Sequence, residues 1–205
     1  EIIMGNVMDY LEWRGDLTFD QSPFNDVDNV ILSQLAYVNF RDVIPSVQMN
    51  KGITLKAAAQ LFFDFHTEEE LMQDKSFIKD APKLLKKAAQ TNRFRDVILS
   101  DYVDMVDETL EKQFGAFHIK LSPQCTYVAF RGTDDTLVGW KEDFNMSFIS
   151  PVPSQEDAVK YLDDTCSYIR GKLYVGGHSK GGNLAIYSAI HCSKRVRKKI
   201  QCVYN

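Results

Sequence analysis

A glycine-rich segment, residues 176–182, constrains the fold of this chain more than any other feature. It reads GGHSKGG and lies between an apolar run at residues 173–175 and a segment, residues 183–187, with small and apolar side chains in a helical pattern. A strand that turns into a helix at a single residue crowds the backbone, so the positions two before and two after that residue favour glycine. The pattern therefore predicts a strand, a sharp turn at Ser179 and a helix.

Ser179 in such a turn is a candidate nucleophile. The turn lifts the hydroxyl clear of the sheet and places it at a helix N-terminus, where unpaired backbone N–H groups favour negative charge on a substrate oxygen. The N–H of Lys180 is one predicted oxyanion donor. The strand over residues 126–130 stops at residues 131–133, where Thr133 offers a backbone N–H and a hydroxyl as a second donor. A glycine-rich turn without chemistry is the alternative interpretation.

Several segments together resemble a known family. The sequence Phe-Arg-Gly-Thr at residues 130–133, then Trp140, Asp143-Phe144 and residues 177–182 are similar to the class 3 (fungal triglyceride) lipases. The chain resembles more closely a bacterial family of uncharacterised lipase-like α/β hydrolases, the Mbeg-like proteins. The further segments expected for that family are residues 4–6, 9–11, 13–16, 22–25 and 27–28, with Lys180 where lipases usually carry leucine.

The resemblance implies both site residues and a limit on the substrate. Ser179 is the implied nucleophile, and Thr133 and the Lys180 N–H are the implied oxyanion donors. Asp143 is the implied structural acid that braces the loop running from Arg131 to Thr133. The charged side chain at position 180, in place of leucine, argues against long-chain triglyceride as the substrate.

The base that must activate a serine hydroxyl is not evident in the sequence. The expected order is serine, acid, histidine, but the residues after Ser179 contain no Asp or Glu and a single histidine, His191. On an ideal helix His191 lies about 18 Å from the serine, so it is predicted to be an ordinary helix residue. Residues 200–205 have the pattern of a further core strand, and we expect the protein to continue past Asn205 with an acid and then a histidine.

Other titratable residues near the motifs are assigned structural roles. His178 precedes the nucleophile and should point elsewhere, His118 lies on a predicted strand, and His66 ends a helical stretch. Asp134 and Asp135 would be poor neighbours for a developing oxyanion, so they are interpreted as turn-forming carboxylates.

The composition limits partners and location. A chain of 205 residues, 44% of them hydrophobic, can bury one substantial core. The net charge of −4 gives no case for nucleic acid or anionic membranes as partners, and the basic run at residues 194–199 is interpreted as a solvated face.

The four cysteines form no C-x-x-C pair and are predicted to be free buried thiols; no metal or organic cofactor is required. No secretory signal pattern and no apolar run long enough to cross a bilayer is present, which favours a cytoplasmic location.

The chain is predicted to divide into a helical region, residues 1–95, packed on an α/β-hydrolase core, residues 96–205, and we expect this core to be incomplete at its C-terminus. Helices are predicted over residues 25–40, after Thr54, over residues 81–90 and after Ser154, and strands near residues 97–99, 115–121, 126–130, 173–175 and 200–205. The predicted fold class is α/β, an α/β-hydrolase-like three-layer sandwich with a largely parallel central sheet, whose entry pair of strands could be antiparallel.

The early helices are predicted to pack beside the sheet; the alternative is a lid over Ser179. Phe62, Phe63 and Phe65 would suit an acyl pocket, but aromatic residues at helical spacing favour a core. The predicted function is hydrolysis of a small-molecule carboxylic ester or related acyl bond through an acyl-enzyme on Ser179. The alternatives are a non-catalytic scaffold for protein or ligand binding, and a serine peptidase or acyltransferase.

Overall fold

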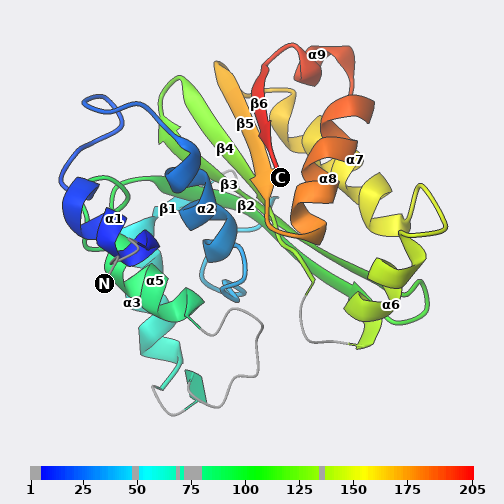
Figure 1. Cartoon of the computed structure of the whole chain (residues 1–205), viewed down its shortest axis with the longest axis horizontal. Helices are drawn as coiled ribbons and strands as arrows, with labels where there is room; N and C mark the ends of the chain where they lie inside the picture. The colour runs from blue at the N-terminus through cyan, green and yellow to red at the C-terminus, as the bar shows by residue number, and fades with distance from the viewer. Residues whose placement is uncertain (1–5, 48–50, 68–69, 72–79, 134–136) are drawn as a thin grey trace, which may run out of the picture.

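The chain forms a mixed α/β fold around a six-stranded sheet (Figure 1). The computed structural model describes residues 6–47, 51–67, 70–71, 80–133 and 137–205. The strands within these residues are β1 (Gly52–Thr54), β2 (Ile98–Asp107), β3 (Lys112–Ser122), β4 (Cys125–Phe130), β5 (Lys172–Gly177) and β6 (Ile200–Tyr204). The helices are α1 (Val7–Arg14), α2 (Asp26–Leu35), α3 (Leu55–Phe65), α5 (Ala81–Ala88), α6 (Leu137–Asn145), α7 (Pro153–Cys166), α8 (Lys180–His191) and α9 (Lys194–Arg197).

The sheet is mixed rather than largely parallel, which corrects the predicted fold class. Strands β1 to β4 pair antiparallel in succession, and only the pairs β4–β5 and β5–β6 among the described strands are parallel. The physical reason lies in the connections. Short turns join β2 to β3 and β3 to β4, which permits only antiparallel neighbours, whereas helices α6 and α7, and then α8 and α9, supply the crossovers that parallel neighbours need. The antiparallel entry pair, β2 with β3, is confirmed.

Several helix boundaries follow from their capping residues. The Asn25 side chain accepts the backbone N–H groups of Val27 and Asp28 in the first turn of α2, and the Thr54 hydroxyl accepts an N–H of α3 at 3.2 Å. Pro82 lies in the first turn of α5. Helix α2, however, ends at Leu35 rather than at residue 40, and α7 begins just before Ser154 because a proline opens it. Helices α1, α6 and α9 and strand β1 were not predicted from the sequence.

Two hydrophobic cores lie on opposite faces of the sheet. Alternate residues of β4 face each core: Tyr127 and Ala129 belong to the first, and Val128 and Phe130 belong to the second. Helices α1, α2, α3 and α5 close the first core, and α7 and α8 close the second (Figure 1). The N-terminal helices therefore pack beside the sheet.

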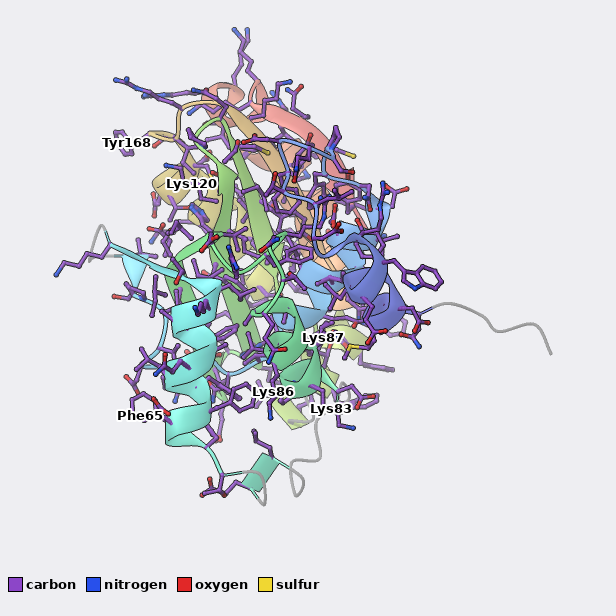
Figure 2. All side chains as sticks on the ribbon, turned by 90° about the vertical axis from the view of Figure 1, so that its left-hand side faces the viewer. Phe65, Lys83, Lys86, Lys87, Lys120 and Tyr168 are labelled. Atoms are coloured by element: carbon purple, nitrogen blue, oxygen red, sulfur yellow. The ribbon has the colours of Figure 1, made fainter. Side chains whose placement is uncertain are left out.

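The aromatic residues of α3 divide between the core and the surface. Phe62 is buried in the first core, whereas Phe65 is 60% exposed and points outward from α3 (Figure 2). The core role predicted for these aromatic residues is thus confirmed for Phe62 and wrong for Phe65.

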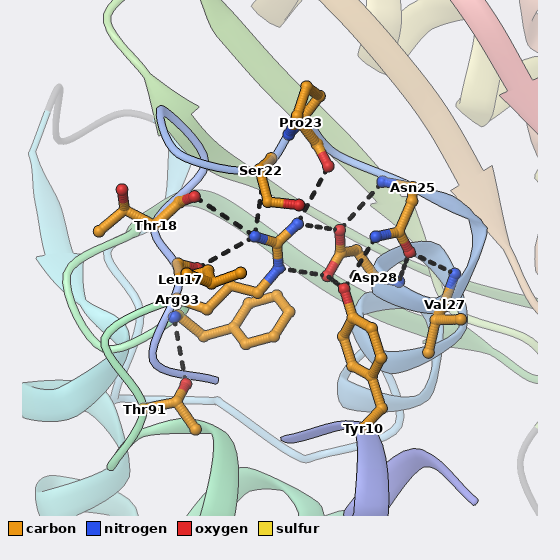
Figure 3. A network of polar contacts seen from close by, with 11 residues as sticks. Tyr10, Leu17, Thr18, Ser22, Pro23, Asn25, Val27, Asp28, Thr91 and Arg93 are labelled. Atoms are coloured by element: carbon orange, nitrogen blue, oxygen red, sulfur yellow. Dashed lines mark hydrogen bonds and ion pairs between the residues drawn. The ribbon is translucent and has the colours of Figure 1, made fainter. Parts of the chain in front are cut away.

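A buried ion pair organises the segment between α1 and α2 (Figure 3). The Arg93 guanidinium donates to the Asp28 carboxylate at 2.7 Å from Nε and 2.5 Å from Nη2, and both side chains are fully buried. The remaining guanidinium N–H groups donate to the carbonyls of Leu17, Thr18, Ser22 and Pro23. Asp28 also accepts the Tyr10 hydroxyl at 3.1 Å, so one carboxylate joins α1, α2 and the segment after α5.

A buried histidine lies between β3 and α7. His118 Nε2 is 2.9 Å from the Thr165 hydroxyl, and Nδ1 is 3.4 Å from the Asp101 carboxylate. Burial lowers the pKa of His118 from 6.5 to about 4, and Asp101 opposes part of this decrease. His118 is therefore neutral in the folded protein at neutral pH.

The free energy of unfolding is expected to decrease as the pH falls from 6.5 to about 4, the ordinary and the folded pKa of His118. In this window the unfolded chain binds a proton that folded His118 does not, which lowers stability by about 3 kcal/mol in all, and the effect levels off below the folded pKa. Urea titrations at several pH values measure this slope. His118→Gln should flatten it; an unchanged slope in the variant would assign the pH dependence to other groups.

Candidate active site

Ser179 occupies a sharp, strained turn between β5 and α8. Its φ of 58° and ψ of −125° lie in a region that residues with a Cβ rarely adopt. Gly177 and Gly181 make the turn possible. A Cβ on Gly177 would lie 2.5 Å from the carbonyl carbon of Gly181 across the turn and 2.5 Å from the carbonyl oxygen of Phe130, and a Cβ on Gly181 would collide with that oxygen. The predicted strand, turn and helix, and the need for glycine on both sides of the serine, are confirmed.

The parallel pairing of β4 and β5 brings the two predicted loops together. Phe130 at the end of β4 lies opposite Gly177 at the end of β5, so both strands end at the same edge of the sheet. A Cβ on Gly132 would come within 2.6 Å of the His178 carbonyl oxygen, which shows how closely the loops approach. Ser179 itself is exposed at this edge.

A cleft of about 1090 Å³ contains Ser179. Thr133, Trp140, Asp143 and His178 line it on the side of the sheet edge and α6. The opposite wall comes from the N-terminal region, with Val7 and Met8 of α1, Tyr37 just after α2, and Asp80, Lys83 and Leu84 at the start of α5. The N-terminal helices therefore shape the cleft as well as the first core.

Asp143 of α6 holds the loop that follows β4. The Thr133 hydroxyl donates a hydrogen bond to Asp143 Oδ2. The other carboxylate oxygen is buried and has no hydrogen-bond partner among the described residues. This contact joins α6 to the loop that follows β4, and any part of Asp143 or Thr133 in catalysis stays a prediction.

Arg131 anchors the other end of the same loop. Its guanidinium forms a buried ion pair with Asp104 of β2, and its backbone N–H donates to the Gly115 carbonyl at 2.8 Å. Asp104 also pairs with Arg41 at 3.3 Å. Arg131 is not among the described residues that line the cleft, and it supports the loop from behind.

Lys180 directs its charge away from the cleft. Its side chain is 1% exposed, and Nζ donates to Glu142 Oε2 at 2.6 Å and to the Gln113 carbonyl at 2.7 Å. The ammonium group therefore gives no reason to exclude a long acyl chain from the cleft, which corrects the argument drawn from the sequence.

Tyr37 is a cleft residue that the sequence analysis missed. Its hydroxyl lies 3.0 Å from His178 Nδ1, although the two residues are 141 positions apart in the chain. Burial, together with the nearby Asp143 carboxylate, raises the pKa of Tyr37 to about 12, although Arg131 opposes the increase. The phenol therefore stays protonated at neutral pH. No local signal marks this residue, because only the fold brings it to Ser179.

Among the described residues, no histidine is hydrogen-bonded to the Ser179 hydroxyl. His191 lies in the last turn of α8, with its ring 4.2 Å from that of Tyr187, and is the ordinary helix residue predicted from the spacing. His66 caps α3 and stacks on Phe62 at 4.4 Å. Asp134, Asp135 and residues 4–5 of the expected family segments lie outside the described residues.

The described part of the chain offers few other sites for chemistry. No three of its His, Cys, Asp and Glu side chains are grouped so that they could hold a metal ion. All four cysteines are free, with Cys166 and Cys192 buried and Cys125 and Cys202 partly buried. None of the described helices has the length and apolar character that crossing a membrane requires.

The fold and the site define a mixed α/β protein with an exposed serine in a strained turn from strand to helix. The sequence model of the Mbeg1-like family matches residues 88–205, more than half of the chain. The chain therefore belongs to the Mbeg1-like family. The matched segment contains β2 to β6 and every candidate site residue identified from the sequence. No curated protein and no solved structure matches the chain.

Proposed function

We propose that this protein is a serine hydrolase of the lipase-like α/β class that cleaves a carboxylic ester or a related acyl bond. The main supporting observation is the conformation of Ser179, which is strained, exposed and placed at the N-terminus of α8 inside a large cleft. A strained backbone conformation costs free energy, so its presence at an exposed residue suggests a functional constraint. Thr133, tied to Asp143, lies beside it as the second candidate oxyanion donor.

The chemistry proceeds through an acyl-enzyme. The Ser179 Oγ forms a bond to the acyl carbon while its proton passes to a base. The carbonyl oxygen becomes negatively charged and accepts hydrogen bonds from the backbone N–H groups of Lys180 and Thr133. Collapse of this intermediate breaks the bond to the leaving alcohol, which takes the proton from the base. Water then attacks the acyl-serine and releases the acid by the reverse sequence of proton transfers.

The base stays a prediction. The described residues supply none within hydrogen-bond distance of the Ser179 hydroxyl. A cytoplasmic location likewise stays a prediction.

The two regions of the chain are proposed to work as one unit. Strand β1 belongs to residues 1–95 and pairs with β2 of the core region, and α1 and α5 contribute a wall of the cleft. The apolar part of that wall, formed by Val7, Met8 and Leu84, suits the acyl portion of a small ester.

Labelling with a fluorophosphonate probe tests the proposed function. In the full-length protein, peptide mass spectrometry is expected to locate the adduct on Ser179, because only an activated serine attacks the phosphorus atom at a useful rate. Heat-denatured protein is the control and should not react. Absence of an adduct on protein that circular dichroism shows to be folded would contradict the proposal.

The absence of a base among the described residues favours a second candidate, a non-catalytic scaffold that keeps the turn but binds a protein or ligand. The labelling experiment separates the two. If Ser179 reacts, profiling with ester, peptide and amine acceptors distinguishes an esterase from a peptidase or an acyltransferase.

A further inference from the structure

The residue after the proposed nucleophile carries a buried charge. Lys180 opens α8, and its ammonium group lies under the turn, 2.6 Å from Glu142 Oε2 and 1% exposed. Placing an ion pair out of water is costly, and an apolar pair of similar volume is often as stable or more so. A buried pair at this position therefore requires an explanation other than general stability.

Glu142 is held as tightly as Lys180. Its Oε2 also accepts the Gln113 N–H at 3.0 Å, and its Oε1 accepts the Ser154 N–H at 2.9 Å. The carboxylate thus joins β3, the start of α7 and the start of α8 through α6. Because the Lys180 ammonium group and both Glu142 carboxylate oxygens are hydrogen-bonded, Lys180 has one well-defined position.

The neighbouring residue on α6 holds the second oxyanion loop. Asp143 accepts the hydroxyl of Thr133, while Glu142 accepts the ammonium of Lys180. Two consecutive residues of one helix turn therefore hold the two residues whose backbone N–H groups would bind the oxyanion.

We infer that the Lys180–Glu142 ion pair is a positioning device that sets the Lys180 N–H relative to Thr133. The inference rests on the proposed hydrolase function. Oxyanion donors act only when they lie about 2.7–3.1 Å from the position that the oxygen reaches in the transition state. The strained Ser179 sets the direction of the chain on one side of the Lys180 N–H, and the side-chain anchor restrains it on the other.

The test compares p-nitrophenyl butyrate hydrolysis and the rate of fluorophosphonate labelling across variants of the full-length protein. Lys180→Met removes the ammonium group and keeps an unbranched stem. It is expected to lower kcat and the labelling rate about 10- to 100-fold, with KM changed less than about twofold, because the lost interaction acts in the transition state. Lys141→Met is the matched control, since Lys141 of α6 forms an exposed ion pair with Glu111, which lies between β2 and β3.

The double variant Lys180→Met, Glu142→Gln separates positioning from stability. It leaves no unpaired buried charge, so its melting temperature should recover toward that of the wild type while kcat stays low. Recovery of both the melting temperature and kcat in the double variant would overturn the inference. Wild-type labelling rates in folded Lys180→Met would overturn it as well. Failure of the wild-type protein to label at Ser179 would overturn the proposed function itself, and the inference with it.

Discussion

Ser179→Ala is expected to abolish fluorophosphonate labelling and to lower ester hydrolysis by about 10⁴-fold or more. The alanine side chain has no oxygen to form the acyl-enzyme, and the oxyanion donors alone retain little of the rate. The fold should persist, because the Ser179 side chain forms no capping hydrogen bond to α8. Probe labelling, hydrolysis of p-nitrophenyl esters and circular dichroism measure the three quantities. Continued labelling of the alanine variant would place the nucleophile elsewhere.

Ser179→Gly separates the strain from the chemistry. Glycine reaches a φ of 58° and a ψ of −125° without a Cβ clash, so this variant should be inactive yet more stable than the wild type by about 1–3 kcal/mol. Ser179→Ala keeps the Cβ and should show no such gain. Urea denaturation compares the three proteins, and equal stability of the glycine and alanine variants would show that the turn stores no strain.

Arg93→Met is expected to lower the free energy of unfolding by about 3–5 kcal/mol. The substitution leaves the fully buried Asp28 carboxylate without its cation and removes the donors to four backbone carbonyls (Figure 3). Methionine fills part of the volume but supplies no hydrogen bond, so the cost of the unpaired charge remains. Urea denaturation with a linear extrapolation measures the change.

Arg95→Met is the matched control, two residues away. Its ion pair with Asp96 is exposed, with 45% and 73% of the two side chains accessible, so little change in stability is expected. Adding Asp28→Asn to Arg93→Met should restore part of the loss because it removes the unpaired charge. A small effect of Arg93→Met alone would mean that water reaches Asp28 in the variant.

Neighbouring residues alone were sufficient to predict some parts of this structure. Asn25 and Thr54 cap α2 and α3 through contacts within three residues, and Gly177 and Gly181 permit the turn at Ser179. The short turn between β3 and β4 also contained the signal for antiparallel pairing, but the alternation of strands and helices outweighed it in the prediction of a parallel sheet.

Contacts between distant segments decided the rest, and no local pattern encodes them. Helix α1 and Tyr37 reach the cleft only because the first core packs the N-terminal helices against the sheet. A lysine at position 180 is evident from the sequence, but the side to which its ammonium group points depends on Glu142, 38 residues earlier in the chain. Capping and turn geometry depend on adjacent residues, whereas the partner of a buried charge and the walls of a cleft depend on which elements pack together. The turn at Ser179 therefore follows from the sequence, and the site around it follows from the fold.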